Sequence, residues 1–93
     1  MILREIRKAH AGFTCYPKVN EIVSGNWGCG AFGGNLHAKL LIQWIVATLV
    51  GKKLLYCPFN HKDLLEPTYQ AAKHLSVGEA YDILYSYERT LLE

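Results

Sequence analysis

The sequence has few of the features that identify common functional classes. Its 93 residues contain three cysteines, Cys15, Cys29 and Cys57, and no C-x-x-C pair. An odd number of cysteines without this spacing argues against a disulfide framework or a zinc site, and it favours a reducing compartment. The four histidines also lack metal-ligand spacing, so we expect no metal and no cofactor.

The sequence also lacks a large excess of positive or negative charge, and it lacks a long apolar run. Ten Lys and Arg residues against eight Asp and Glu residues give a net charge of +2, and no basic run stands out. This excess is too small to predict a nucleic-acid partner. The N-terminus lacks the apolar core of a signal peptide, and the longest apolar run, Leu40 to Val50, is too short to span a bilayer. We therefore expect an intracellular, soluble protein that binds neither membranes nor nucleic acid directly.

The hydrophobic pattern predicts an α/β chain in the order helix, strand, glycine-rich loop, helix, strand, helix, helix. Helical spacing predicts the first helix over 2–11, with Gly12 as its stop. Short apolar segments predict strands over 20–25 and 54–57, the second of them buried. The segment 36–50 is apolar on nearly every face, which predicts a helix buried on several sides and ended by Gly51 as a C-cap.

The last third of the chain predicts two helices. Residues 60–74 favour a helix interrupted by Pro67, with either an irregular first turn or a start near Glu66. Ser76 and Glu79 form an S-x-x-E capping box before a helix whose apolar face we assign to Val77, Ala80, Tyr81, Leu84 and Leu91. A sheet of two strands is too small to cover a helix that is apolar on nearly every face. We therefore expect 1–93 to be an incomplete domain that needs a partner or the rest of a larger domain.

The stretch from Ser24 to Asn35, SGNWGCGAFGGN, holds five of the eight glycines and includes a G-x-G-x-x-G pattern. Glycines between a strand and a helix let backbone N–H groups converge on an anion, and the helix dipole adds to the attraction. The glycine-rich stretch can therefore be interpreted as a phosphate or diphosphate site, or as a tight turn that only packs two elements together. No Walker A motif occurs, and the acidic residue that a dinucleotide-binding fold places after its second strand is absent.

The segment GNWGCGAFGG closely resembles the diphosphate-binding loop of the poly(ADP-ribose) glycohydrolase family, whose catalytic domain is a macrodomain. REIRKAHAGF resembles the helix upstream of that loop, and LIQWIVAT resembles the helix after it. LLYCPFN resembles the next strand, and LSVGEAYDIL the helix that closes the domain. The resemblance covers essentially the whole chain, so 1–93 is expected to be the C-terminal part of a catalytic macrodomain.

The resemblance implies a site for ADP-ribose or poly(ADP-ribose). It places Asn26 and the backbone N–H groups of Gly28, Cys29, Gly30 and Ala31 at the diphosphate, with Trp27 in the same loop. It places Phe32 by the ribose near the scissile bond and Phe59 against the adenine. Without the resemblance, Trp27 and Phe59 are typical of core aromatics, and Cys29 is typical of a small buried residue.

The resemblance also implies that the catalytic acid is missing. The family cleaves a ribose–ribose bond with a glutamate from a Gly-Gly-Gly … Gln-Glu-Glu signature, and no two carboxylates are adjacent in this chain. We therefore assign no catalytic residue and predict that the chain alone is inactive, with the missing N-terminal half of the domain as a candidate partner. A non-catalytic ADP-ribose binder and a small dinucleotide-binding module remain as alternatives.

Overall fold

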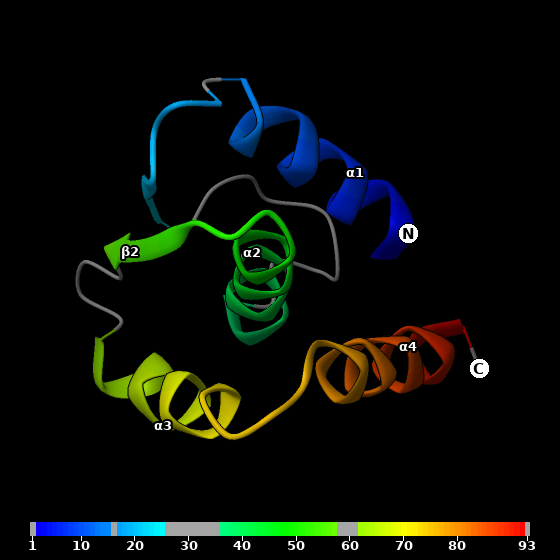
Figure 1. The fold of residues 1–93 in the computed structure, drawn as a ribbon. Helices are drawn as coiled ribbons and strands as arrows, with labels where there is room; N and C mark the ends of the chain where they lie inside the picture. Colours follow the sequence, from blue (N-terminus) through cyan, green and yellow to red (C-terminus); the bar gives the residue numbers. More distant parts are fainter. Residues whose placement is uncertain (1, 16, 26–35, 58–61, 93) are drawn as a thin grey trace.

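The computed structural model describes residues 2–15, 17–25, 36–57 and 62–92. The elements in these ranges follow the predicted α/β order (Figure 1). They are α1 (Ile2–Phe13), β1 (Glu21–Gly25), α2 (Leu36–Leu49), β2 (Lys53–Cys57), α3 (Lys62–Ala72) and α4 (Val77–Leu92). None of the helices in this part of the chain is long and apolar enough to cross a membrane.

Helix α2 lies at the centre of the molecule, with α1 on one side, α3 and α4 on the other, and β2 beside it (Figure 1). Its apolar residues form half of the described core, because α1, α3, α4 and β2 all pack against it. The prediction of a helix buried on several sides is confirmed. Two of its buried residues are polar, Lys39 and Gln43, and both are important for the site described below.

Strands β1 and β2 pair in parallel, from Glu21 opposite Lys53 to Gly25 opposite Cys57. Ile22 and Leu54 pack against the core on the face turned toward α2. The other face, here called the open sheet face, consists of exposed side chains: Glu21, Val23, Lys53, Leu55 and Cys57. The prediction that 54–57 is a buried strand is wrong for this reason, since only one face of the sheet is covered.

The helix ends differ from the predictions where tertiary packing decides. Helix α1 does not stop at Gly12, because Phe13 is buried in the core and extends it by one residue. Gly51 has a φ of 71°, which confirms the predicted C-cap after α2. Helix α3 contains Pro67 in its interior, so the predicted start near Glu66 is wrong and the longer helix is the better description.

The capping box before α4 is confirmed. The Ser76 backbone N–H donates to Glu79 Oε1 at 2.9 Å, and the Glu79 N–H donates to Ser76 Oγ at 3.1 Å. Ala80 and Leu84 are buried and Val77 packs against the core, as predicted. Tyr81 is exposed and stacks on Tyr85 with ring centroids 6.4 Å apart, so its assignment to the apolar face is wrong. The Leu91 side chain lies outside the described part of the structure.

Candidate functional site

The two strands end side by side. Gly25 and Cys57 are the last residues of β1 and β2, and they are partners in the parallel register. The segments 26–35 and 58–61 therefore leave the sheet from adjacent strands at the same edge. Ligands of open α/β sheets bind outside this carboxyl edge of the strands, which makes it the candidate site.

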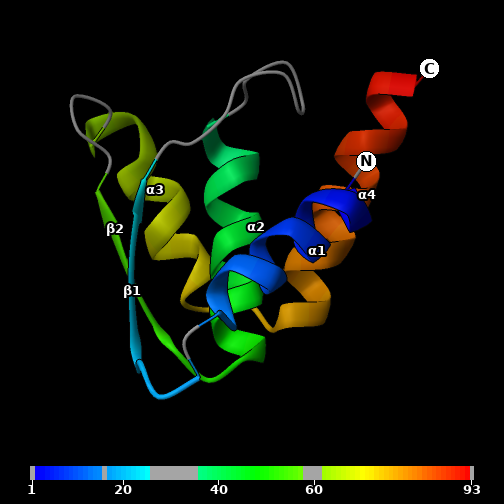
Figure 2. The same cartoon turned by 90° about the horizontal axis from the view of Figure 1, so that it is seen from above.

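Two helices begin at the same edge. Figure 2 shows the amino ends of α2 and α3 at the end of the molecule where β1 and β2 finish. A helix amino end carries unpaired N–H groups and about half a positive charge. The candidate site thus lies among two strand ends and two helix ends whose dipoles favour an anion.

The residues predicted to bind ADP-ribose lie outside the described residues. This holds for Phe59 and for the seven residues of the glycine-rich loop: Asn26, Trp27, Gly28, Cys29, Gly30, Ala31 and Phe32. The structure does describe the residues that flank both segments, Gly25 and Leu36 for one, Cys57 and Lys62 for the other. It brings those flanks to one edge, and the individual binding roles stay predictions.

Gln43 connects α2 to the end of β1. Its side chain is 0% exposed, and its Nε2 donates to the carbonyl oxygen of Gly25 at 3.0 Å. Because only a donor can satisfy a carbonyl, this contact also fixes the orientation of the side-chain amide. The Oε1 atom is buried and accepts no hydrogen bond in the described structure, which is a costly arrangement in an apolar helix. The bond holds the point at which the chain leaves β1.

Lys39 lies one helical turn before Gln43, in the first turn of α2. It is 4% exposed, and its ammonium group has no hydrogen bond or ion pair with the described residues. Residues four apart share a face of a helix, so Lys39 lies on the face that Gln43 turns toward the end of β1. In the part of the chain that the structure describes, Gln43 Oε1 is the buried side-chain polar atom without a partner, so the ammonium group of Lys39 is not itself fully buried although the stem is.

A bond between side chains connects the two helices that begin at this edge. His37, in the first turn of α2, hydrogen-bonds through Nδ1 to Oγ1 of Thr68 on α3. Both residues are partly buried. The contact joins the first turn of α2 to the middle of α3.

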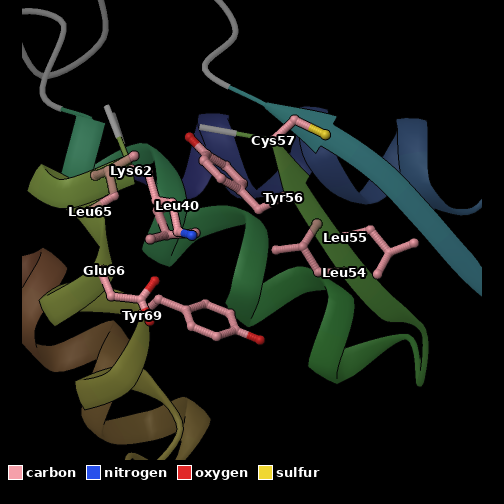
Figure 3. A pocket seen from close by; sticks show the side chains of 9 residues that line it. All are labelled: Leu40, Leu54, Leu55, Tyr56, Cys57, Lys62, Leu65, Glu66 and Tyr69. Atoms are coloured by element: carbon pink, nitrogen blue, oxygen red, sulfur yellow. The ribbon is translucent and has the colours of Figure 1, made fainter. Parts of the chain in front are cut away.

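A pocket of about 520 Å³ lies between β2, α3 and the start of α2 (Figure 3). Figure 3 shows the side chains of Lys62, Tyr56 and Tyr69 turned toward the same space between β2 and α3. Burial raises the pKa of Tyr56 to about 12, so its phenol stays protonated and can donate a hydrogen bond. The lining is mostly apolar: Leu40, Leu54, Leu55, Tyr56, Cys57, Lys62, Leu65, Glu66 and Tyr69.

Sequence reasoning missed Lys39, Gln43, His37 and the pocket. Lys39 and Gln43 had a signal, because each is a polar residue inside an otherwise apolar helical run. The pocket had none, since it depends on how α3 packs beside β2.

Comparison with known proteins shows which family the chain belongs to. The family described as poly(ADP-ribose) glycohydrolase, with a macro domain fold, matches residues 1–66. The chain belongs to the poly(ADP-ribose) glycohydrolase family. The resemblance of the glycine-rich loop and its flanking elements is thereby confirmed, and so is the α/β, macrodomain-like fold class.

Relatives in this glycohydrolase family come from a nematode and a plant. The chain is 42% identical over 66 residues to poly(ADP-ribose) glycohydrolase 1 of Caenorhabditis elegans, which covers 68% of this chain and 8% of the relative. Poly(ADP-ribose) glycohydrolase 2 of the same organism is 42% identical over 67 residues, or 68% and 14% of the two chains. Probable poly(ADP-ribose) glycohydrolase 2 of Arabidopsis thaliana is 30% identical over 73 residues, or 71% and 14%. The matched part of the chain is thus a small share of each relative.

Proposed function

We propose that this chain forms one side of an ADP-ribose site in a glycohydrolase macrodomain. The glycine-rich loop from Asn26 to Phe32 holds the diphosphate, and Phe59 stacks on the adenine. The observation that carries the proposal is the pairing of Gly25 with Cys57, because it starts both segments from neighbouring positions. Family membership supports ADP-ribose over other anions.

The edge suits a diphosphate for physical reasons. The diphosphate of ADP-ribose is negatively charged, and two helix dipoles face it at the amino ends of α2 and α3. Glycines next to a strand end allow the backbone to approach the phosphates closely. The adenine is an apolar ring that needs a flat partner, which an aromatic side chain after β2 supplies.

The chemistry of bond cleavage comes from outside this chain. Hydrolysis of a glycosidic bond needs a carboxyl group placed to protonate the leaving oxygen. The carboxylates of the described strands and of the starts of α2 and α3 are Glu21, at the opposite end of β1, and Asp63 and Glu66 on α3. None belongs to the family's glutamate signature, so we assign this chain to binding and the acid to another part of a complete domain.

The rest of that domain is the partner we infer. All-parallel sheets are covered on both faces in almost all proteins, and here Val23 on the open sheet face is 71% exposed. The pocket beside β2 adds a second apolar surface next to the same sheet. Each relative has ample further sequence to cover both, because the matched region is 8–14% of its length.

The test is a hybrid of the C. elegans poly(ADP-ribose) glycohydrolase 2 in which this full chain replaces the matching region. We expect the hybrid to release ADP-ribose from the polymer, and the isolated chain to release none. A folded hybrid without activity or ADP-ribose binding would contradict the proposed site. Cleavage by the isolated chain would contradict the assignment of the acid to another part, and tighter binding of NAD than of ADP-ribose would favour a dinucleotide module.

A further inference from the structure

We propose that the rest of the macrodomain adds a strand to the free edge of β1, an inference that rests on the proposed function and makes its partner more specific. The free edge is the side of β1 that faces away from β2. Among the described elements, β2 is the strand partner of β1, and no residue of β1 is fully buried. Proteins normally pair or protect such an edge, because its backbone N–H and C=O groups bind other extended chains.

The register shows which backbone groups face the free edge. The Lys53 N–H donates to the Asn20 carbonyl at 2.9 Å, and Lys53 is the direct partner of Glu21. In a parallel pair, this geometry means that every second residue of β1 bonds to β2, beginning with Asn20. The residues between them direct their N–H and C=O groups to the free edge: Glu21, Val23 and Gly25.

Gln43 is consistent with this direction and limits the length of the edge. The Gly25 carbonyl accepts a hydrogen bond from Gln43 Nε2 at 3.0 Å, so it is bonded to α2 rather than to β2. The N–H and C=O groups of Glu21 and Val23 have no hydrogen-bond partner in the part of the chain that the structure describes. The open part of the free edge is therefore formed by the backbone of these two residues.

The chemistry of these groups requires an extended partner. A donor and an acceptor recur at every second residue, a spacing that a neighbouring strand matches. A helix packed on the open sheet face would cover side chains but would leave the backbone groups of Glu21 and Val23 unpaired. The Val23 side chain is 71% exposed and lies beside Leu55. An apolar residue of the added strand next to Val23 would continue this apolar row across the sheet.

A second copy of the chain is a poorer occupant of the same edge. Two β1 strands paired antiparallel about Val23 would place Glu21 opposite Gly25, where Gln43 already bonds the carbonyl. A strand from the rest of the domain can pair with Glu21 and Val23 and end before Gly25. The relatives have ample sequence to supply it, because the matched region is 8–14% of their length.

The first experiment measures hydrogen–deuterium exchange in the hybrid enzyme described above, resolved to single amides by mass spectrometry. Ile22 and Ser24 provide the slow reference, because the register directs their amides to β2. Val19, an exposed residue before β1, provides the fast reference. We expect the amides of Glu21 and Val23 to exchange as slowly as those of Ile22 and Ser24. Exchange as fast as that of Val19 would overturn the proposal.

The second experiment removes one N–H group from the edge. Proline is tolerated on an edge strand when its missing N–H faces solvent, but not inside a sheet. Val23→Ala is the matched variant, because it shortens the side chain and keeps the N–H. We expect Val23→Pro to lower the melting temperature of the hybrid by about 5 °C or more beyond the effect of Val23→Ala, and Val19→Pro to change it little. Equal melting temperatures of Val23→Pro and Val23→Ala would contradict an added strand.

Two further readouts separate this proposal from the proposed function and from a dimer. If the hybrid binds no ADP-ribose but the amides of Glu21 and Val23 exchange slowly, the site is wrong and the added strand stands. If it binds ADP-ribose while these amides exchange rapidly, the added strand is wrong and the site stands. Slow exchange that appears only at protein concentrations where light scattering shows dimers would assign the edge to a second copy and overturn the proposal.

Discussion

Val23 of β1 and Leu55 of β2 are direct partners on the open sheet face, where 71% and 36% of their side chains are exposed. An apolar pair at the middle of a parallel sheet is normally covered by a helix or another strand layer. The pairing therefore defines the centre of the surface that we assign to the rest of the macrodomain.

Val23→Lys tests this surface in two settings. In the isolated chain, we expect a lower average mass by light scattering, because a charge at the centre of an exposed apolar patch reduces self-association. In the hybrid enzyme, we expect a lower melting temperature, because the same charge becomes buried. Leu3→Lys, at an exposed leucine of α1, is the control. Equal effects of the two substitutions in the hybrid would mean that the open sheet face is not covered.

The capping box gives a pH prediction. Hydrogen bonds from the backbone and side chain of Ser76 lower the pKa of Glu79 below its ordinary value. A carboxylate whose pKa is lower in the folded state stabilises that state at pH values above the pKa of the unfolded state. This contribution is lost as the pH falls through the pKa of the folded state. We expect Glu79→Gln to lower the stability of the chain near pH 7 and to have little effect in strong acid.

Ser76→Ala is the matched variant for this prediction, because it removes the other half of the capping box. We expect it to lower the free energy of unfolding by about 1 kcal/mol, with a weaker pH dependence than Glu79→Gln, because the backbone N–H of Ser76 still donates to the Glu79 carboxylate. The two profiles can be compared by chemical denaturation at a series of pH values. A Glu79→Gln effect that persists unchanged in acid would exclude this electrostatic account.

The hydrogen bond between His37 and Thr68 predicts that removal of the Thr68 hydroxyl lowers the stability of the chain. Thr68→Val keeps the shape of the side chain and removes the partner of the imidazole. We expect a loss of about 1 kcal/mol in the free energy of unfolding. Thr90→Val is the control, because the Thr90 hydroxyl donates to the Ser86 carbonyl within its own exposed helical turn. Equal losses of stability in the two variants would show that the contact with His37 does not stabilise the fold.

Gln43→Met should change the free energy of unfolding only slightly, because it has two opposing effects. The substitution removes one hydrogen bond to Gly25, and it also removes a buried oxygen that accepts no bond in the described structure. These effects oppose each other, so the free energy of unfolding should change by less than about 1 kcal/mol. Leu41→Met, at a buried position of the same helix, measures the cost of a methionine alone. A much larger loss at Gln43 would show that the bond to Gly25 dominates.

Local signals predicted most of the fold. The 3.6-residue period located the helices, S-x-x-E located the start of α4, and Gly51 located the end of α2, because these features depend on neighbours within a few residues. Tertiary contacts decided the remainder. The buried side chain of Phe13 carries α1 past Gly12, and the missing cover on one face leaves Leu55 exposed although its segment is apolar.

The candidate site was predictable in part. The glycine-rich loop is contiguous in the sequence, so its pattern could be recognised, whereas the hydrogen bond from Gln43 to Gly25 requires the packing of α2 against the sheet. A polar residue in an apolar run shows that something unusual occurs there, but it does not identify the partner. The parallel register that brings the ends of β1 and β2 together is likewise a property of the assembled sheet.

The most direct test of the account is a crystal structure of the hybrid enzyme with ADP-ribose bound. The account predicts the diphosphate beyond Gly25 and Cys57, in front of the first turn of α2, with the adenine on the side of β2. An ADP-ribose molecule bound elsewhere, for example in the pocket between β2 and α3, would contradict it.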